Sequence, residues 1–351
     1  MRALKLVDAN RLELRDVPVP EPGPGRVRVR IAGAGICHSD VTIMAVGAAG
    51  SPFHGITLGH EGAGYVDALG AGVTGLTEGQ PAIIDLMWAC GHCRQCVGGR
   101  SNACQTNGTR WMFPTTPGLG PDGTMAEYIV ADARHVVPLD GGPLPPLDPT
   151  RVAPLADAGV TPMHAINTVR NRLDAGAVAV VIGLGGLGHM AVQILRAVGA
   201  ARIIAVDANP AKVAQATRLG ADIALLSDGD TAARILEETA GFGADVVFDF
   251  VGVAPSVALA TAVVAPEGHL RLAGLGGGEF TYSLNGVNAV PWGVTVQTSY
   301  GGTRADLDEV LALARRGLIH VETTDYPLED YARAFDDLEA GRLPGRAILL
   351  P

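Results

Sequence analysis

Four of the five cysteines in this chain crowd one short stretch, at Cys90, Cys93, Cys96 and Cys104, and the fifth is Cys37. Four thiolates at such close spacing can surround one zinc ion tetrahedrally. The same ligands also suit an iron–sulfur cluster or a pair of disulfides. Because no export signal is visible and cysteine fills all four positions, we expect a closed structural zinc site rather than either alternative.

Three other segments carry metal-binding side chains but lie far apart in the sequence. They are the run Cys37-His38-Ser39-Asp40, the pair His60-Glu61 and the residue Asp157. Each alone is more often a buried or surface polar residue than a ligand. Together, however, a thiolate, an imidazole and a carboxylate are the three protein ligands of a catalytic zinc site with one open position. In that arrangement Asp40 would hold the second nitrogen of His60, and Glu61 would lie beside the metal.

A glycine-rich loop follows an apolar run at residues 178–182. It matches G-x-G-x-x-G and reads Gly183, Leu184, Gly185, Gly186, Leu187, Gly188. Such glycines permit a tight turn, a close approach to a pyrophosphate and close packing of helix on strand. Asp207 ends the next apolar run, where its carboxylate would bind ribose hydroxyls and repel a 2′-phosphate. The loop therefore predicts NAD; the alternative is a structural turn, with Asp207 capping a helix near Pro210.

The elements around these motifs divide the chain into two kinds of sequence. Residues 1 to about 150 are rich in Gly, Pro and short runs such as 26–31 and 82–86, which indicates β structure, and 141–149 is typical of a boundary loop. After residue 158, strand-like and helical patterns alternate, as in a doubly wound parallel sheet. Strands are expected at 178–182, 202–207, 223–226, 246–251 and 270–275, and helices at 186–199 and from 210.

Composition excludes several classes of protein. The 351 residues are 48% apolar and 18% charged, as in a folded protein of about two domains. With 26 basic and 36 acidic residues the net charge is −10, so we expect no nucleic acid or membrane partner. Glycines, His189 and Arg196 interrupt the longest apolar stretch, 177–201, which argues against a membrane span. The N-terminal sequence lacks a signal-peptide pattern, so we expect a cytoplasmic protein.

In their order and separation, these motifs resemble the zinc-dependent medium-chain alcohol dehydrogenase family, over essentially the whole chain. The aspartate of Leu155-Ala156-Asp157 makes the bacterial NAD-dependent secondary-alcohol dehydrogenases the most similar members. The resemblance implies an α/β fold with a GroES-like β catalytic domain, at 1–157 and 296–351, and a Rossmann NAD-binding domain at 158–295. It also implies a structural zinc lobe at about 88–106 and a homodimer or homotetramer.

The same resemblance implies roles for individual residues. Cys37, His60 and Asp157 would bind catalytic zinc, and Ser39 would contact the substrate oxygen. Many members place a histidine, the end of a proton relay, where this chain has Thr42. The residues expected to contact the cofactor are His38, Thr161, Gly183, Gly185, Gly186, Leu187, Gly188, Asp207, Lys212, Leu275, Tyr300 and Arg346.

These features predict an oxidoreductase that moves a hydride between NAD(H) and an alcohol/carbonyl pair. The apolar runs 87–89 and 111–113 favour apolar or secondary alcohols over the main alternative, a polyol dehydrogenase of the sorbitol type. A non-catalytic protein on the same fold would be expected to lack a ligand or Ser39, and all are retained. Candidate residues of the substrate pocket are Trp88, Trp111, Met112, Leu275 and Trp292.

Overall fold

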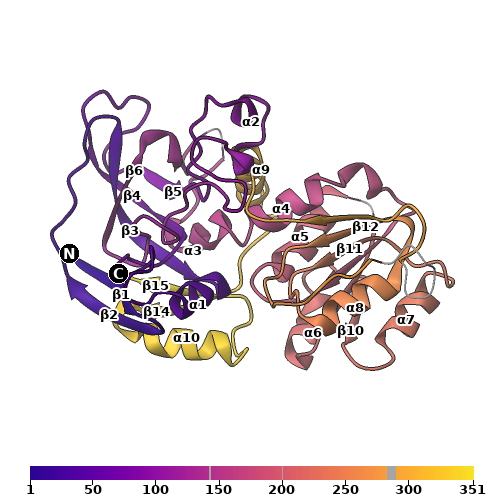
Figure 1. The fold of residues 1–351 in the computed structure, drawn as a ribbon. Helices are drawn as coiled ribbons and strands as arrows, with labels where there is room; N and C mark the ends of the chain where they lie inside the picture. Colours follow the sequence, from indigo (N-terminus) through magenta and orange to yellow (C-terminus); the bar gives the residue numbers. More distant parts are fainter. Residues whose placement is uncertain (142–143, 200, 283–289) are drawn as a thin grey trace. The chain divides into compact units, whose positions relative to one another are not determined.

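The structure is a computed structural model that describes residues 1–141, 144–199, 201–282 and 290–351. It consists of two compact units, Met1–Val160 with Gly301–Pro351, and Thr161–Tyr300 (Figure 1). The first unit is therefore discontinuous in sequence. Residues 142–143 of the expected boundary loop lie outside the described residues. No helix of the described segments is long and apolar enough to cross a membrane.

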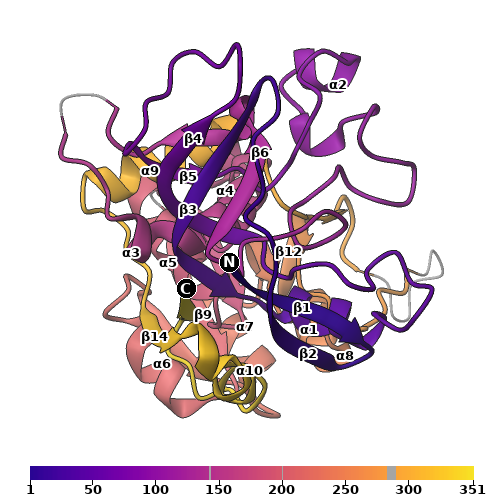
Figure 2. The same cartoon turned by 90° about the vertical axis from the view of Figure 1, so that its left-hand side faces the viewer.

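The first unit is mainly β structure. Its largest sheet has the order β14-β15-β3-β4-β5-β7, with β6 also paired to β3, and β1 and β2 form a separate hairpin (Figure 2). The strands are β1 (Arg2–Asp8), β2 (Arg11–Asp16), β3 (Arg26–Ile36), β4 (Glu61–Leu69), β5 (Pro81–Ile84), β6 (Tyr128–Asp132), β7 (Val136–Pro138), β14 (Thr323–Pro327) and β15 (Arg346–Leu350). The helices are α1 (His38–Ala45), α2 (Arg94–Val97), α3 (Pro149–Val152), α9 (Arg304–Arg315) and α10 (Tyr331–Glu339), with 3₁₀ turns at Ser101–Ala103, Ala133–His135, Ala153–Ala156 and Leu328–Asp330.

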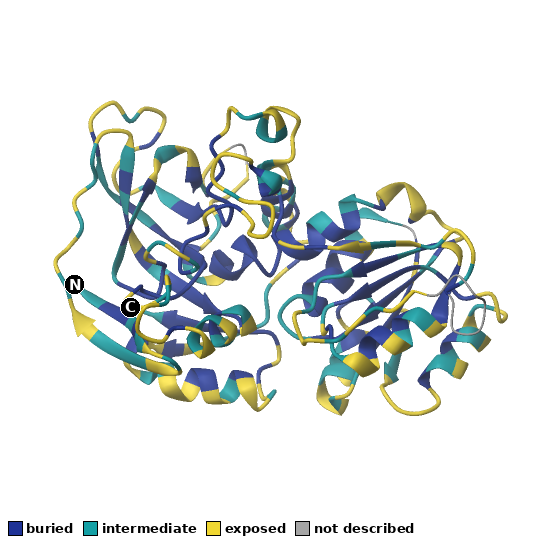
Figure 3. Cartoon of the chain, in the orientation of Figure 1, coloured by how far each residue is buried: buried dark blue, intermediate teal, exposed yellow. Residues whose placement is uncertain are grey.

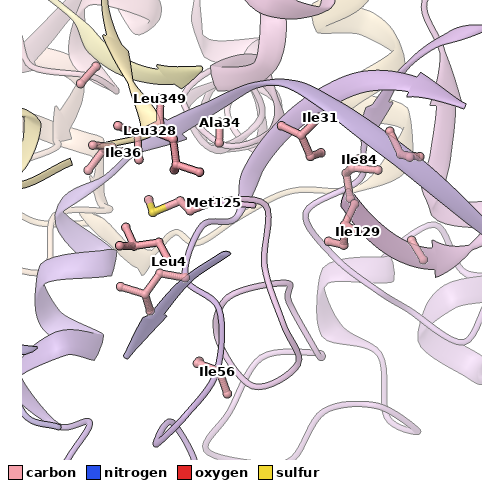
Figure 4. Packing of buried hydrophobic residues seen from close by; sticks show 14 of the residues in the cluster. Leu4, Ile31, Ala34, Ile36, Ile56, Ile84, Met125, Ile129, Leu328 and Leu349 are labelled. Atoms are coloured by element: carbon pink, nitrogen blue, oxygen red, sulfur yellow. The ribbon is translucent and has the colours of Figure 1, made fainter. Parts of the chain in front are cut away.

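One hydrophobic core holds this unit together. The alternating residues Val27, Val29 and Ile31 of β3 are buried, as the period-two pattern requires. Figure 4 shows Leu4 and Met125 lying under the same strand. Burial of this apolar surface stabilises the position of β3. Cys37 directly follows the last residue of β3 and precedes the first residue of α1.

The second unit is a six-stranded, wholly parallel sheet with the order β10-β9-β8-β11-β12-β13. Helix α5 packs on β8 and β9, α6 on β9 and β10, and α8 on β11 and β12. Figure 3 shows the strands largely buried and the outer faces of α6, α7 and α8 exposed. The elements are α4 (Val160–Asn167), a 3₁₀ turn (Arg170–Arg172), β8 (Val178–Ile182), α5 (Gly188–Val198), β9 (Arg202–Asp207), α6 (Pro210–Ala216), β10 (Ile223–Leu226), α7 (Thr231–Glu238), β11 (Ala244–Asp249), α8 (Ala254–Val263), β12 (Val264–Leu272) and β13 (Thr295–Thr298).

The predicted doubly wound parallel sheet is thus confirmed, and so are the strands at 178–182, 202–207 and 223–226. The strand expected at 270–275 is instead β12, which ends at Leu272. The chain leaves the sheet there because the N–H groups of Ala273 and Gly274 both donate to the carbonyl of Asp249. The strand expected at 246–251 is β11, which ends at Asp249 because the N–H groups of Val251 and Gly252 donate to the side-chain Oδ1 of Asp249.

Candidate active site

Two neighbouring strands and a 3₁₀ turn bring the scattered ligands of the first unit together. Cys37 follows β3, His60 precedes β4, and Glu61 is the first residue of β4. Gly35 of β3 pairs with Glu61, so the antiparallel register places both segments at one end of the sheet. Asp157 follows the 3₁₀ turn Ala153–Ala156, which contacts β3 and β4.

Donor atoms of Cys37, His60, Glu61 and Asp157 all lie within 4.8 Å of one another. Asp157 Oδ2 is 3.6 Å from both Cys37 Sγ and His60 Nε2. All four residues are buried. A buried thiol, imidazole and carboxylate aimed at a common point are a zinc ligand set, so the residues present fit a catalytic zinc ion.

Asp40 orients two members of this cluster. It is fully buried in the first turn of α1, and its Oδ2 accepts a hydrogen bond of 2.9 Å from the N–H of Cys37. Its Oδ1 lies 3.2 Å from His60 Nδ1, which leaves Nε2 facing the other ligands. Burial opposes protonation of His60, but Asp40 and Asp157 outweigh it and raise its pKa well above the ordinary value.

Arg346, the first residue of β15, provides the positive charge of the cluster. Its Nη2 lies 2.8 Å from Glu61 Oε1, 3.3 Å from Cys37 Sγ and 3.4 Å from Asp157 Oδ2. Burial raises the pKa of Glu61 to about 7, although Arg346 acts against this shift. The family resemblance implied only a contact of Arg346 with the pyrophosphate, and that contact remains a prediction. A lone arginine in the apolar run 346–350 was the available signal for its burial in an ion pair.

Gly35 makes room for the Glu61 carboxylate. An added Cβ at Gly35 would lie 2.0 Å from Glu61 Oε2. That oxygen is buried and accepts no hydrogen bond within the described residues. The Glu61 side chain therefore occupies space that exists only because residue 35 has no side chain.

Replacing Arg346 by methionine is expected to lower the free energy of unfolding of the chelator-treated protein by about 3–5 kcal/mol. Removing the guanidinium leaves the buried carboxylates of Glu61 and Asp157 without their counter-charge. Urea unfolding measures the loss. Arg304→Met is the matched control, because Arg304 pairs with Asp308 on the exposed surface and such a pair contributes about 1 kcal/mol or less. Equal losses in the two variants would contradict the prediction.

The second metal-binding cluster is formed by the four crowded cysteines, all of which are free thiols. Cys93 Sγ lies 3.5 Å from Cys96 Sγ and 4.0 Å from Cys104 Sγ. Hydrogen bonds from Thr106 and from backbone N–H groups lower the pKa of Cys90 to about 5, which favours a thiolate ligand. Four sulfur donors without an open position fit a structural zinc ion.

In the second unit, the three glycines of the G-x-G-x-x-G loop serve different purposes. Gly183 has a φ of +86°, and a Cβ at Gly188 would lie 1.7 Å from the Gly183 carbonyl oxygen, so the fold itself needs both. A Cβ at Gly185 would meet only Lys212 Nζ, at 3.9 Å. The space over Gly185 is therefore an open cradle before the N-terminus of α5, which fits a pyrophosphate.

Asp207 is tied to this loop. Its Oδ2 accepts the N–H of Leu184 at 2.6 Å, and its Oδ1 accepts the N–H of Asn209 at 2.7 Å. Asn209, not Asp207, caps α6, because its side chain accepts the N–H of Ala211. The structure therefore does not support the alternative in which Asp207 is the cap of that helix. It places the carboxylate beside the glycine loop, and the contact of Asp207 with the cofactor ribose stays a prediction.

The other predicted site residues are placed as follows. Ser39 is half-buried, with its Oγ 3.7 Å from Cys37 Sγ, and His38 is exposed. Thr42 donates its hydroxyl to the carbonyl of His38. Thr161 is buried at the start of α4. In the second unit, Tyr300 and Leu275 are exposed.

The candidate pocket residues differ in their surroundings. Trp88 is buried and stacks on His135 with ring centroids 6.0 Å apart. It also lines a cavity of about 400 Å³ together with Met1 and Val17. Trp111 and Trp292 are more than four-fifths exposed. Their place in a substrate pocket stays a prediction.

Comparisons with known proteins agree with both halves of this description. Residues 23–141 match the alcohol dehydrogenase GroES-like domain family, and residues 186–316 match the zinc-binding dehydrogenase family. The chain is 32% identical over 340 residues to an alcohol dehydrogenase of Moraxella sp. (strain TAE123), covering 96% of this chain and 95% of the relative. It is 33% identical over 369 residues to the NAD-dependent alcohol dehydrogenase of Sulfurisphaera tokodaii, covering 100% of both.

Solved structures show the same likeness. The alcohol dehydrogenase of Aeropyrum pernix superposes with a TM-score of 0.89 at 32% identity, covering 100% of both chains. An acetophenone reductase from Geotrichum candidum in complex with NAD superposes with a TM-score of 0.86 at 29% identity, covering 100% of this chain and 97% of the other. The D-arabinose dehydrogenase of Sulfolobus solfataricus superposes with a TM-score of 0.82 at 28% identity, covering 100% and 99%.

A GroES-like domain, a six-stranded parallel Rossmann-type sheet and two zinc ligand sets define the class of this protein. The chain belongs to the zinc-containing medium-chain alcohol dehydrogenase family. It is an NAD-dependent alcohol dehydrogenase, an oxidoreductase that acts on CH–OH groups. Its catalytic zinc site comprises Cys37, His60, Glu61 and Asp157, and its structural zinc site comprises the four crowded cysteines.

Proposed function

We propose that the protein interconverts apolar secondary alcohols and ketones with NAD(H), as its resemblance to the bacterial secondary-alcohol dehydrogenases implies. The observation that carries the proposal is the buried cluster in which Asp157, rather than a second cysteine, stands with Cys37 and His60. The apolar runs 87–89 and 111–113 of the same unit support an apolar substrate. Similarity to an acetophenone reductase is consistent with a ketone substrate.

The residues of the first unit would perform the following roles. Cys37, His60 and Asp157 would hold the metal, and Asp40 would fix the ring of His60. When bound, zinc and NAD supply the Lewis acid for the substrate oxygen and the hydride acceptor. Glu61, paired with Arg346, is close enough to serve as a transient ligand.

Ser39 is the proposed proton carrier. Its Oγ lies beside the Cys37 sulfur, where it would take the hydroxyl proton of an alcohol or return one to a ketone. Thr42 does not extend this path, because its hydroxyl is bonded to the carbonyl of His38. His38, the exposed neighbour of Ser39, would exchange the proton with solvent.

In the second unit, the cofactor would contact the loop 183–188, Asp207 and Lys212. Lys212 Nζ faces the open space above Gly185, which suits the phosphates or the adenosine ribose. Leu275, the backbone N–H of Tyr300 and Thr161 would contact the nicotinamide half. That His38 and Arg346 contact the pyrophosphate stays a prediction from the family resemblance.

A substrate screen tests the proposed specificity. With NAD⁺, kcat/KM for 2-butanol is expected to exceed that for sorbitol by at least about 100-fold, since a pocket without polar partners leaves sorbitol hydroxyls unpaired. In the reverse direction, acetophenone should be reduced with NADH. The same reduction measured with NADPH tests whether the enzyme prefers NAD(H), as the carboxylate of Asp207 predicts. Turnover of sorbitol alone would overturn the proposed substrate class.

A polyol or sugar dehydrogenase is the second candidate, and similarity to a D-arabinose dehydrogenase favours it. This likeness is slightly weaker than that to the acetophenone reductase, with TM-scores of 0.82 and 0.86. The substrate screen therefore decides between the two candidates.

We also propose a cytoplasmic homodimer or homotetramer in which residues 1–157 and 296–351 form the catalytic domain and 158–295 the NAD-binding domain. Strand β13 supports association, because it is an edge strand whose residues are mostly exposed, and exposed edges pair readily. Trp292, just before it, is 85% exposed. Size-exclusion chromatography with light scattering is expected to give two or four chains, and a monomer would contradict the proposal.

A further inference from the structure

Three loops of the second unit are stacked on one another at the carboxyl edge of its sheet. They are residues 183–188 after β8, 250–253 after β11 and 273–278 after β12. A Cβ at Gly183 would lie 2.4 Å from Val251 Cγ2, so the first loop packs directly on the second. A Cβ at Gly252 would lie 2.1 Å from the Gly274 carbonyl oxygen, so the second packs directly on the third.

Hydrogen bonds between backbone groups also join the second and third loops. The N–H of Gly276 donates to the carbonyl of Val251 at 3.1 Å, and that of Gly278 donates to the carbonyl of Gly252 at 2.7 Å. The position of the third loop therefore depends on these contacts with the second loop. Its place follows from that of residues 250–253.

Asp249, the last residue of β11, fixes both of these loops. It is fully buried, and its Oδ1 accepts the N–H groups of Val251 at 2.8 Å and Gly252 at 2.9 Å. Its Oδ2 accepts the hydroxyl of Ser256 at 2.8 Å. Its carbonyl accepts the N–H groups of Ala273 and Gly274. The side chain thus holds the second loop, and its backbone holds the start of the third.

The two neighbouring loops lie where the second half of a dinucleotide is expected. The strand order reverses between β8 and β11, and dinucleotides bind across that point at the carboxyl edge. Asp207, the last residue of β9 on one side of that point, marks the adenosine half. The nicotinamide half then lies toward β11 and β12, which neighbour each other in the sheet (Figure 1). Leu275 stands in the third loop and is 76% exposed.

We propose that Asp249 is a positioning residue for the nicotinamide half of NAD. Its hydrogen bonds to Val251, Gly252 and Ser256 would fix the position of residues 250–253. Those residues in turn fix the position of the loop 273–278, which carries Leu275. This inference rests on the proposed contact between Leu275 and the cofactor. Both carboxylate oxygens of Asp249 accept hydrogen bonds from protein groups, so it would act on the loop and not on the reacting atoms.

Comparison of NAD⁺ with ADP-ribose, which lacks the nicotinamide ring, tests the proposal in the intact protein. Calorimetric titration of Asp249→Ala should show a Kd for NAD⁺ raised at least about tenfold, and a Kd for ADP-ribose within about twofold of wild type. Asp249→Asn keeps an oxygen for both N–H groups, so it should stay within about threefold of wild type for both ligands. The KM for NAD⁺ should rise more than kcat falls.

Asp245→Ala is the matched control, since Asp245 lies at the other end of β11 and accepts the N–H of Val178. It should leave the ratio of the two Kd values unchanged. Equal weakening of both ligands by Asp249→Ala, unchanged NAD⁺ binding, or an Asn variant as impaired as the Ala variant would overturn the proposal. If Asp249→Ala does not fold, Ser256→Ala keeps the Asp249 carboxylate and removes the Ser256 hydroxyl, which donates to Asp249 and accepts the N–H of Val253. This variant should weaken NAD⁺ about threefold without affecting ADP-ribose. A Ser256→Ala protein with no selective change would overturn the proposal.

The wild type separates this inference from the proposed function. Wild-type protein that binds neither ligand would refute NAD binding at the glycine loop. Wild-type protein that binds NAD⁺ and ADP-ribose while Asp249→Ala weakens both equally would refute only the role of Asp249.

Discussion

Replacing Cys37 by serine is expected to lower kcat for alcohol oxidation by about 10³-fold or more and to reduce the zinc content from about two ions per chain to about one. Serine is not deprotonated near neutral pH, so only His60 and Asp157 of the three proposed ligands would remain. A Lewis acid contributes several kcal/mol to such a reaction, and about 4 kcal/mol corresponds to about a thousandfold in rate. Steady-state kinetics and metal analysis by mass spectrometry measure the two effects.

Cys104→Ser is the matched control for this variant, because it makes the same chemical change in the other cluster. It should also remove about one zinc ion per chain, but its main effect should be a lower melting temperature, since structural zinc contributes folding free energy. Its kcat per remaining zinc should stay within about tenfold of wild type. Cys37→Ser protein with unchanged turnover would refute the catalytic zinc site described above.

Replacing Gly185 by alanine is expected to raise the Kd for NAD⁺ about 10- to 100-fold while leaving the melting temperature unchanged. A methyl group at Gly185 meets no protein atom closer than Lys212 Nζ at 3.9 Å, so the fold tolerates it. The methyl group would fill the cradle and keep the pyrophosphate from the backbone N–H groups. Loss of one hydrogen bond to a charged group costs about 1.5–3 kcal/mol, which corresponds to about this range of affinity.

Two glycines of the same region are controls for this prediction. Gly188→Ala should lower the melting temperature as well as the affinity, because its Cβ would overlap the carbonyl of Gly183. Gly199→Ala, at the other end of α5, should change neither, because residue 199 has an ordinary φ of −124° and no neighbour of its Cβ closer than 3.3 Å. Gly185→Ala protein that binds NAD⁺ as tightly as wild type would show that the pyrophosphate lies elsewhere.

The parts of the site that could be predicted from sequence are those whose chemistry depends on local spacing. The four crowded cysteines and the loop 183–188 are each contiguous, so their residue types and separations alone restrict what they can bind. The strands of the parallel sheet were predicted because their apolar runs are short and bounded by turn residues. Cys37, His60 and Asp157 were assembled only through the resemblance to a family, since no local rule brings distant segments together.

The sequence by itself determined which groups are available for chemistry in this protein, namely two zinc ligand sets and a glycine loop followed by Asp207. Only the tertiary structure decided which side chains control them. Arg346 neutralises Glu61, Gly35 makes room for it, and Asp249 holds the loops beside the cofactor site. These contacts depend on the register of paired strands and on close approaches between backbones, and a shift of one residue in register would turn each side chain to the opposite face.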